Sequence, residues 1–482
     1  MLPTIATGNV ASAIGGAFEV ANSCRFNSAD SAYMHKTLGS TSNQRTFTLS
    51  AWVKRSGLGV ANQIMSMDRS GPRTEIAFNS DDKIACNFNP SGSSWSEFYS
   101  VAVFRDVSAW YHVVVSVDTT QGTDTNRLKI YVNGSLISFT GSLPSQDFDT
   151  GWNVSGNVHA VGRYENGSSG YFNGYMAEVC WIDGTAYAAS DFGEFDEDSP
   201  TIWKPKDVSG LTFGTHGFYL DFEDSANLGN DANGGTDLTE VNLAATDQMT
   251  DTPTLNYSVM NPLNVPTSNL PTFAEGNLKT TSPGSGGVTK FGGTSTIGMT
   301  QGKWYLEAKA TVDGTYSRNV IGITGEASSC ADLNRAFDLQ TNSCFGYGSE
   351  GGDSISNNST SSYGDTYTTG DIVGVAIDLD NLKLYFSKNG TWQDSGDPTS
   401  GATGTGAVSI ATAVASTTDG IYFVMQGDNT GSSALSIFEF NFGSPIYTIS
   451  SGNADGNGYG NFEYAVPSGY FALNSKNLAE FG

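Results

Sequence analysis

Positively charged residues are scarce in this sequence, and its overall charge density is low. The 482 residues include 23 Lys and Arg against 49 Asp and Glu, which gives a formal net charge of −26. Charged residues make up 15% of the chain, compared with about 25% in typical globular proteins. Because phosphate binding needs clustered cations, we expect no nucleic-acid partner.

Cysteine and long apolar runs are also scarce. The cysteines form no CxxC pair and are too few for a disulfide scaffold, so we expect buried free thiols, with one bridge between Cys330 and Cys344 as the alternative. No run approaches the ~18 apolar residues of a membrane span. No cation precedes Arg25, so we expect no signal peptide and no membrane insertion. The five cysteines are Cys24, Cys86, Cys180, Cys330 and Cys344.

Glycine, aromatic residues and alternating segments are abundant instead. There are 58 glycines, and aromatic residues make up 12% of the chain. The segment 46–53 alternates polar and apolar residues, as a half-buried strand does. Residues 109–118 are typical of a central strand, and 127–137 of a hairpin that turns at Asn133-Gly134. No segment of ten or more residues has a convincing helical period, so we predict an all-β chain.

Four parts are predicted along the chain. They are an N-terminal arm (1–24), a β block (25–225), an extended connector (226–290) and a second β block (291–482). The connector is predicted because five of the 14 prolines fall between Pro253 and Pro283, and proline blocks regular ladders and helices. Both blocks are predicted to be antiparallel β-sandwiches.

The first block resembles the concanavalin-A-like jelly roll of laminin-G-like domains. The residues that carry the resemblance are FTLSAWVKR (47–55), DVSAWYHVVVSVDTTQGTDTNRLKIYVNG (106–134) and GYMAEVCWIDG (174–184). The last two stretches are similar to those of such domains in tailed-bacteriophage proteins. The resemblance implies a sandwich of two antiparallel sheets.

The second block resembles a SPRY domain. GKWYLEA (302–308) resembles the opening strand of this domain. GDTYTTGDIVGVAIDLDNLKLYFSKNGTW (364–392) resembles its most diagnostic pair of strands. YAVPSGYFALNSKNL (464–478) resembles the C-terminal closure of this domain in phage proteins, and residues 229–264 resemble a segment that follows laminin-G-like domains there. Together these similarities imply a virion protein of a tailed phage, made in the host cytoplasm and placed on the tail or capsid surface.

Catalysis was considered because glucan hydrolases share the jelly roll. Such enzymes resemble one another through a strand that carries two carboxylates. In retaining enzymes the two carboxyl groups lie ~5–5.5 Å apart. The nearest candidate, Glu194 to Ser199, has Ser199 in place of the last carboxylate and Pro200 directly after it, so we expect a solvated acidic loop. No Ser lies in a G-x-S-x-G frame, and His112 is expected to be a packed imidazole. We predict no catalytic residues and no enzymatic activity.

Metal binding is left open by the sequence. Asn453 to Gly458 resembles the start of a calcium loop, but Glu463 falls one residue short of the twelfth position, so we expect a turn. No cofactor is required by any motif. The resemblance to laminin-G-like domains allows calcium at a loop rim, where Asp118, Asp124 and Asp183 are candidates without a defined ligand set.

Three aromatic residues are candidate ligand contacts. Trp95, Tyr347 and Trp392 lie in polar, Gly-rich surroundings, where an exposed ring can stack on a sugar. The alternative is an aromatic side chain packed on a loop. The strand residues Trp52, Trp110, Trp181 and Trp304 are expected in the core.

The function predicted from these features is recognition of a host-surface glycan or protein by a phage tail fibre or spike. The alternative is a head-decoration or head-fibre protein, and a glycan depolymerase is the third hypothesis. The arm before Arg25 is predicted to dock on other virion proteins. Phage appendages are commonly homo-oligomers, often trimers, although these residues do not show it. At a net charge of −26, we expect a neutral or cation-bridged glycan, or a basic patch on another virion protein.

Overall fold

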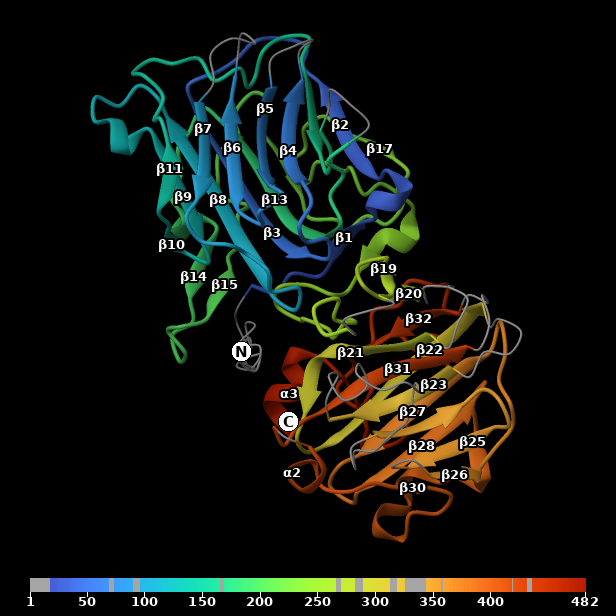
Figure 1. The fold of residues 1–482 in the computed structure, drawn as a ribbon. Helices are drawn as coiled ribbons and strands as arrows, with labels where there is room; N and C mark the ends of the chain where they lie inside the picture. The colour runs from blue at the N-terminus through green and yellow to red at the C-terminus, as the bar shows by residue number, and fades with distance from the viewer. Residues whose placement is uncertain are drawn as a thin grey trace. The chain divides into compact units, whose positions relative to one another are not determined.

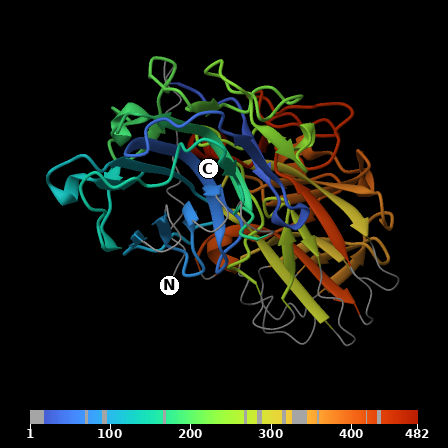
Figure 2. The same ribbon diagram turned by 90° about the horizontal axis from the view of Figure 1, so that it is seen from above.

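The computed structural model divides the chain into two compact units after Asn256. It describes residues 18–68, 73–89, 96–164, 169–265, 270–281, 289–312, 319–325, 344–356, 359–417, 419–430 and 436–482. All structural statements concern these ranges, and each unit is described by itself (Figures 1 and 2).

The first unit contains two antiparallel sheets. Sheet 1 has the order β10 (Ser135–Leu136), β9 (Leu128–Val132), β8 (Trp110–Asp118), β3 (Thr46–Arg55), β13 (Gly174–Asp183), β1 (Ser23–Phe26) and β18 (Gln248–Met249), with β16 (Phe218–Leu220) on β13. Sheet 2 has the order β11 (Phe139–Gly141), β7 (Ser96–Ser100), β6 (Ile84–Phe88), β5 (Arg73–Phe78), β4 (Asn62–Asp68), β12 (Val158–Val161), β2 (Tyr33–Thr37) and β17 (Thr239–Val241). The strands β14 (Gly193–Phe195) and β15 (Trp203–Pro205) form a short hairpin whose strands pair with neither sheet.

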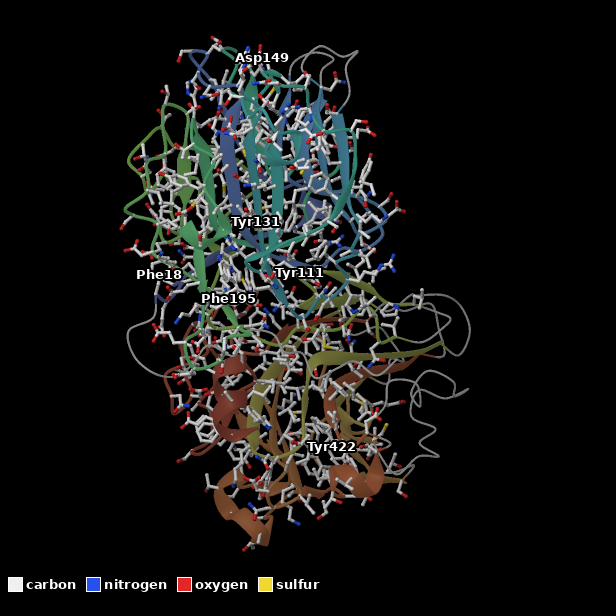
Figure 3. All side chains as sticks on the ribbon, turned by 90° about the vertical axis from the view of Figure 1, so that its left-hand side faces the viewer. Phe18, Tyr111, Tyr131, Asp149, Phe195 and Tyr422 are labelled. Atoms are coloured by element: carbon white, nitrogen blue, oxygen red, sulfur yellow. The ribbon has the colours of Figure 1, made fainter. Side chains whose placement is uncertain are left out.

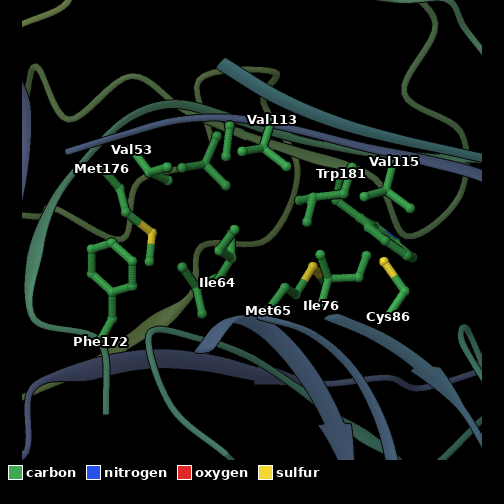
Figure 4. Close-up of a cluster of buried hydrophobic side chains, with 14 of the residues drawn as sticks. Val53, Ile64, Met65, Ile76, Cys86, Val113, Val115, Phe172, Met176 and Trp181 are labelled. Carbon is green, nitrogen blue, oxygen red and sulfur yellow. The ribbon is translucent and has the colours of Figure 1, made fainter. Parts of the chain in front are cut away.

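The alternation of apolar residues explains how the two sheets pack. Every second residue of a strand faces the same side, so Val53 on β3 and Val113 and Val115 on β8 share one face of sheet 1. Figure 4 shows these valines opposite Ile76 and Cys86, which come from sheet 2. The buried cluster between the sheets is the core of the unit.

The second unit also contains two sheets. Sheet 3 has the order β19 (Thr272–Ala274), β20 (Lys279–Thr281), β32 (Ile437–Asn441), β22 (Lys303–Val312), β27 (Ile372–Asp378), β28 (Lys383–Lys388) and β29 (Thr391–Trp392), with β30 (Val408–Ser409) on β28 and β33 (Phe471–Ala472) parallel to β22. Sheet 4 has the order β21 (Thr289–Met299), β31 (Tyr422–Thr430), β23 (Asn319–Thr324), β24 (Cys344–Gly348), β25 (Asp353–Ser356) and β26 (Ser359–Ser362). The prediction of an all-β chain with two antiparallel sandwiches is confirmed.

Helical segments are short throughout the described residues. The α-helices are α2 (Ala413–Ser416) and α3 (Ser475–Phe481). The 3-10 segments are Ser28–Asp30, Asp124–Asn126, Ala189–Asp191, Ala245–Asp247, Gln393–Ser395 and Pro398–Thr403. Among the described residues, no helix has the length and apolarity that a membrane crossing requires.

The predicted extended connector, 226–290, contributes strands to the sheets of both units. Its first part adds β17 to sheet 2 and β18 to sheet 1, whereas its last part adds β19 and β20 to sheet 3. Apolar side chains explain the difference, because Leu228, Met249 and Met260 are buried in the units. Of the predicted arm, only 18–24 lies in the described range, and there Val20 and Thr254 exchange hydrogen bonds.

The tryptophans and cysteines follow the sequence predictions where the structure describes them. Trp52, Trp110, Trp181 and Trp304 are at most 4% exposed, as core residues are. Cys24, Cys86 and Cys180 are buried free thiols, and Cys344 is buried. Cys330 lies outside the described residues, and so does any bridge between it and Cys344.

A β-bulge in β13 places a carboxylate where it is almost buried. The register shifts between Ala177 and Cys180, and the intervening Glu178 adopts φ +50 and is 6% exposed. Tyr219 donates a 2.6 Å hydrogen bond to Glu178 Oε2. Burial, with a smaller contribution from neighbouring carboxylates such as Asp221, raises the pKa of Glu178 from 4.5 to about 8.

This pKa predicts a pH dependence for the first unit. A carboxyl whose pKa is raised by folding stabilises the protein below its unfolded pKa, and that contribution is lost as pH rises to the folded value. Wild type should lose stability on the order of 5 kcal/mol between pH 4.5 and about 8, and we expect Glu178→Gln to abolish this loss. Urea denaturation at several pH values measures it, and parallel pH profiles of wild type and variant would contradict it.

Candidate ligand-binding face

The outer face of sheet 2 carries a row of polar side chains. Ile76 and Cys86 point into the core, so their neighbours Glu75 and Asn87 point outward. The register aligns Ser66 with Glu75 and Glu75 with Asn87. A bulge between Gln63 and Met65 also places Gln63 on this face, because Ile64 and Met65 both pack in the core. Three strands thus bring these side chains together.

Glu75 lies at the centre of the row and is held by two amides. Asn87 Nδ2 donates to Glu75 Oε1 at 2.5 Å, and Gln63 Nε2 donates to Glu75 Oε2 at 2.9 Å. Glu75 and Gln63 are each 2% exposed, and Asn87 is 4% exposed. The three residues form what we call the Glu75 cluster.

The Glu75 cluster leaves two hydrogen-bond acceptors unused. The amide nitrogens of Gln63 and Asn87 donate to Glu75, so the amide oxygens point away from its carboxyl group. Their oxygens, Gln63 Oε1 and Asn87 Oδ1, are buried without a hydrogen-bond partner in the part of the chain that the structure describes. A buried acceptor left unsatisfied costs about 1–3 kcal/mol, so a ligand that brings hydroxyl or N–H donors would recover this free energy.

Half-buried aromatic side chains lie beside the cluster on the same face. The guanidinium of Arg163 stacks 3.7 Å from the centre of the Tyr33 ring, and Tyr33 neighbours Tyr171 at 6.4 Å. Ser66 Oγ donates to the main-chain oxygen of Arg163 at 2.8 Å, which ties this group to β4. Glu97 on β7, paired with Asn87, accepts from the Tyr99 hydroxyl. Aromatic faces beside amides and carboxylates are the combination that sugar binding uses.

The three aromatic residues predicted from the sequence are not brought together. Trp95 lies outside the described residues, directly before β7. The expected exposure of Tyr347 is wrong: its ring is 0% exposed in the core of the second unit, 5.5 Å from that of Phe386. Tyr347 alternates inward on β24, and its hydroxyl donates to the Asp365 main chain. Trp392 is half-buried on β29.

The carboxylates considered for calcium are engaged with the protein itself. Asp183 accepts from Ser42, Asn153 and the main chain of His216. Asp455 accepts from four donors, which makes its loop a turn as predicted. Asp118 likewise accepts from Thr46, Thr120 and Gln121. Within the described ranges, no group of three or more His, Cys, Asp or Glu side chains is placed to hold a metal ion.

The possible catalytic groups are arranged for packing. His112 is fully buried, as predicted, and stacks between Trp52 and Trp203. Trp203 Nε1 donates to His112 Nδ1, so the imidazole proton lies on Nε2, which contacts Ser50 Oγ at 2.8 Å. The ring therefore has no carboxylate to orient it, and Ser50 is only 1% exposed. In the predicted acidic loop, Asp196 accepts from the Asp198 and Ser199 main chains.

Another part of the surface of the first unit is apolar. Phe195, on the β14–β15 hairpin, is 45% exposed while its ring contacts Trp203. Leu136 on β10 is 62% exposed and is paired with Tyr131. Figure 3 labels Phe195 and Tyr131 on this unit.

The sequence contained only a weak signal for the Glu75 cluster. Gln63, Glu75 and Asn87 are polar residues inside strands and each is followed by an apolar residue, which favours the face opposite to the core. Alternation within each strand does not reveal which residues lie side by side. The pairing of β4, β5 and β6 does so.

Two family models match the chain. Residues 27–189 match the concanavalin A-like lectin/glucanases superfamily, and residues 303–427 match the SPRY domain. The comparison with curated proteins returns no match. Both domain types are typical of binding and recognition.

Solved structures show low overall similarity. The SPRY domain of human HERC1 is 14% identical with a TM-score of 0.28, covering 38% of this chain and 96% of its own. A Bacteroides ovatus protein assigned as carbohydrate-binding is 18% identical with a TM-score of 0.32, covering 46% of this chain and 58% of its own. The heptameric SAP-like pentraxin of Limulus polyphemus is 16% identical with a TM-score of 0.26, covering 36% and 80%. No function is transferred from these structures. The family matches and the two sandwiches establish that the chain carries a concanavalin-A-like domain followed by a SPRY domain.

Proposed function

We propose that this protein is a non-enzymatic recognition protein that binds a neutral or cation-bridged glycan on the outer face of sheet 2. The single observation that carries the proposal is the pair of buried amide oxygens, Gln63 Oε1 and Asn87 Oδ1, that lack partners within the described residues. They flank a carboxylate, so the cluster offers acceptors and needs donors. Sugar hydroxyls supply such donors, whereas an anionic glycan would be repelled by Glu75 and by the net charge of −26.

The same proposal places the protein on a tailed-phage virion, as a tail fibre or spike component that contacts the host surface. This part rests on the sequence similarity of residues 106–134, 174–184 and 464–478 to phage proteins. Cryo-electron microscopy of virions with a bound antibody would test it. We expect label on the tail, and label confined to the capsid shell would contradict the tail assignment. Excess soluble protein is also expected to slow phage adsorption.

Glycan binding can be tested with variants of the cluster. Gln63→Leu and Asn87→Leu remove one unpartnered oxygen each, and we expect each to weaken binding to an immobilised neutral glycan about tenfold or more. A glycan array with neutral and acidic members measures this. Asp207→Asn, which changes an exposed carboxylate in the loop after β15, is the matched control and should bind as wild type. Wild-type binding by both leucine variants, with unchanged near-ultraviolet circular dichroism, would contradict the assignment.

A further inference from the structure

Three side chains that are far apart in the sequence meet inside the first unit. Lys54, on β3, donates from Nζ to Asp251 Oδ2 at 2.6 Å and to Asn256 Oδ1 at 2.7 Å. Lys54 and Asn256 are separated by 202 positions. One amine thus contacts both a carboxyl group and a side-chain amide.

The meeting point is enclosed and aromatic. The Lys54 and Asp251 side chains are 1% and 2% exposed. Trp110 Nε1 donates to Asp251 Oδ1 at 3.1 Å, and Lys54 Nζ lies 5.7 Å from the centre of the Tyr175 ring. Water is therefore kept away from the amine, which prevents hydrolysis from competing with a reaction between the side chains.

The amide of Asn256 is held in a fixed orientation. Its Nδ2 donates to the Ser108 main-chain oxygen at 2.8 Å, while its Oδ1 accepts from Lys54. The amine is thereby directed toward the carbonyl group of the amide. Such fixed contact between reacting groups replaces a collision with an intramolecular step.

Burial also favours the reactive form of the amine. Removal of Lys54 from water lowers its pKa, an effect that neighbouring Asp251 partly offsets. Transfer of one proton from the ammonium to the Asp251 carboxylate turns a buried ion pair into two neutral groups, which a low-dielectric site tolerates better. A neutral lysine amine is a nucleophile.

We propose that Lys54 and Asn256 form an intramolecular isopeptide bond, with Asp251 as the residue that transfers protons. Lys54 Nζ attacks the side-chain carbonyl carbon of Asn256, and a carbon–nitrogen bond forms. Asp251 takes a proton from the attacking nitrogen and delivers one to Asn256 Nδ2. The bond from that carbon to Nδ2 breaks, and ammonia leaves. No oxidant or reductant is needed. Asp251, which the Lys54 ammonium protonates before the attack, is protonated again when neutral ammonia leaves, so the protons balance.

The bond would fasten the end of the first unit to its central strand. Asn256 is the last residue of this unit, and β3 lies between β8 and β13 in sheet 1. A covalent link across 202 positions removes conformational freedom from the unfolded chain, as a disulfide does, and therefore favours the folded state.

The test is the mass of the intact full-length chain under denaturing conditions. We expect a mass lower than that of the sequence by one ammonia molecule, and a tryptic digest in which the peptide that starts at Thr46 is joined to the one that contains Asn256. Asn256→Ala and Asp251→Asn are expected to have the unmodified sequence mass. Asp124→Asn, which lies in another loop, should still lose ammonia.

The mass of the wild-type chain tests the proposed bond even if a variant does not fold. A wild-type chain with the full sequence mass after prolonged incubation would overturn the proposal. Loss of one water molecule, which would indicate a link from Lys54 to Asp251, would overturn the role of Asn256.

Discussion

Replacing Glu307 with alanine is expected to lower the free energy of unfolding of the SPRY unit by about 3–5 kcal/mol. Glu307 lies on β22 and is 0% exposed. Its Oε1 accepts from the Tyr464 main chain at 2.8 Å and the Tyr305 hydroxyl at 3.1 Å. Its Oε2 accepts from the Glu463 main chain at 2.9 Å and from Asn441. Alanine would leave these buried donors without their acceptor.

The conservative variant separates this effect from lost packing volume. Glutamine keeps one oxygen but turns an NH₂ group toward two of the donors, so we expect Glu307→Gln to be intermediate. Burial raises the pKa of Glu307 despite its donors, which shows that desolvation opposes the charge. The hydrogen bonds are therefore needed to keep the carboxylate in place.

Differential scanning calorimetry of the full chain can measure this prediction. The transition of the second unit should shift down by about 10 °C, since a unit of this size loses roughly 2–4 °C per kcal/mol. Glu480→Ala, which removes an exposed carboxylate of α3 that accepts from Asn457, is the control and should shift it by less than ~2 °C. An equal shift in both variants would show that Glu307 has no special role.

Acid is expected to destabilise the first unit through two buried histidines. Burial lowers the pKa of both His112 and His159 from 6.5 to about 3. A group whose pKa falls on folding stabilises the protein above its unfolded pKa and loses that contribution as pH falls toward the folded value. The stabilising contribution of each histidine should thus fall by on the order of 5 kcal/mol as pH falls from 6.5 to about 3.

The contacts of the two rings explain why the folded state disfavours the charged form of each histidine. His112 Nδ1 already accepts from Trp203, and His159 packs against Trp152 and Trp181 at 5.2 and 5.5 Å. A second proton on His112 would break its bond to Trp203. On either ring the positive charge would be placed among apolar side chains.

The measurement is the difference between wild type and a doubly substituted variant. His112→Asn with His159→Asn should lower stability at pH 7 but flatten its decrease between pH 6.5 and 3, followed by urea denaturation. Glu178 acts in the opposite direction above pH 4.5, so the comparison is cleanest below that value. A variant whose stability decreases as steeply as that of wild type would contradict the assignment.

Local patterns in the sequence were sufficient for the fold class and for many strands. The predicted strand 46–53 lies within β3, and 109–118 contains β8. The predicted turn at Asn133-Gly134 has positive φ at both residues, as a tight hairpin requires. These features depend on neighbours within a few residues, which is why a period of two and a turn dipeptide reveal them.

Local composition was a poor predictor of the burial of single residues. Tyr347 has glycine on both sides and still lies in the core, because its position on β24 points it inward. The proline-containing connector was predicted to be an extended segment, but its strands complete sheets whose other members are far away in sequence. Composition describes the neighbours along the chain, whereas burial depends on neighbours in space.

The sequence by itself determined that this chain is all-β, acidic and composed of two sandwich domains of the concanavalin-A-like and SPRY types. Only the tertiary structure decided which polar residues meet. Strand register places Gln63 and Asn87 on either side of Glu75, and chain closure brings Asn256 to Lys54 across 202 positions. The physical reason is that alternation is a property of one strand, whereas register and closure depend on pairings between distant strands.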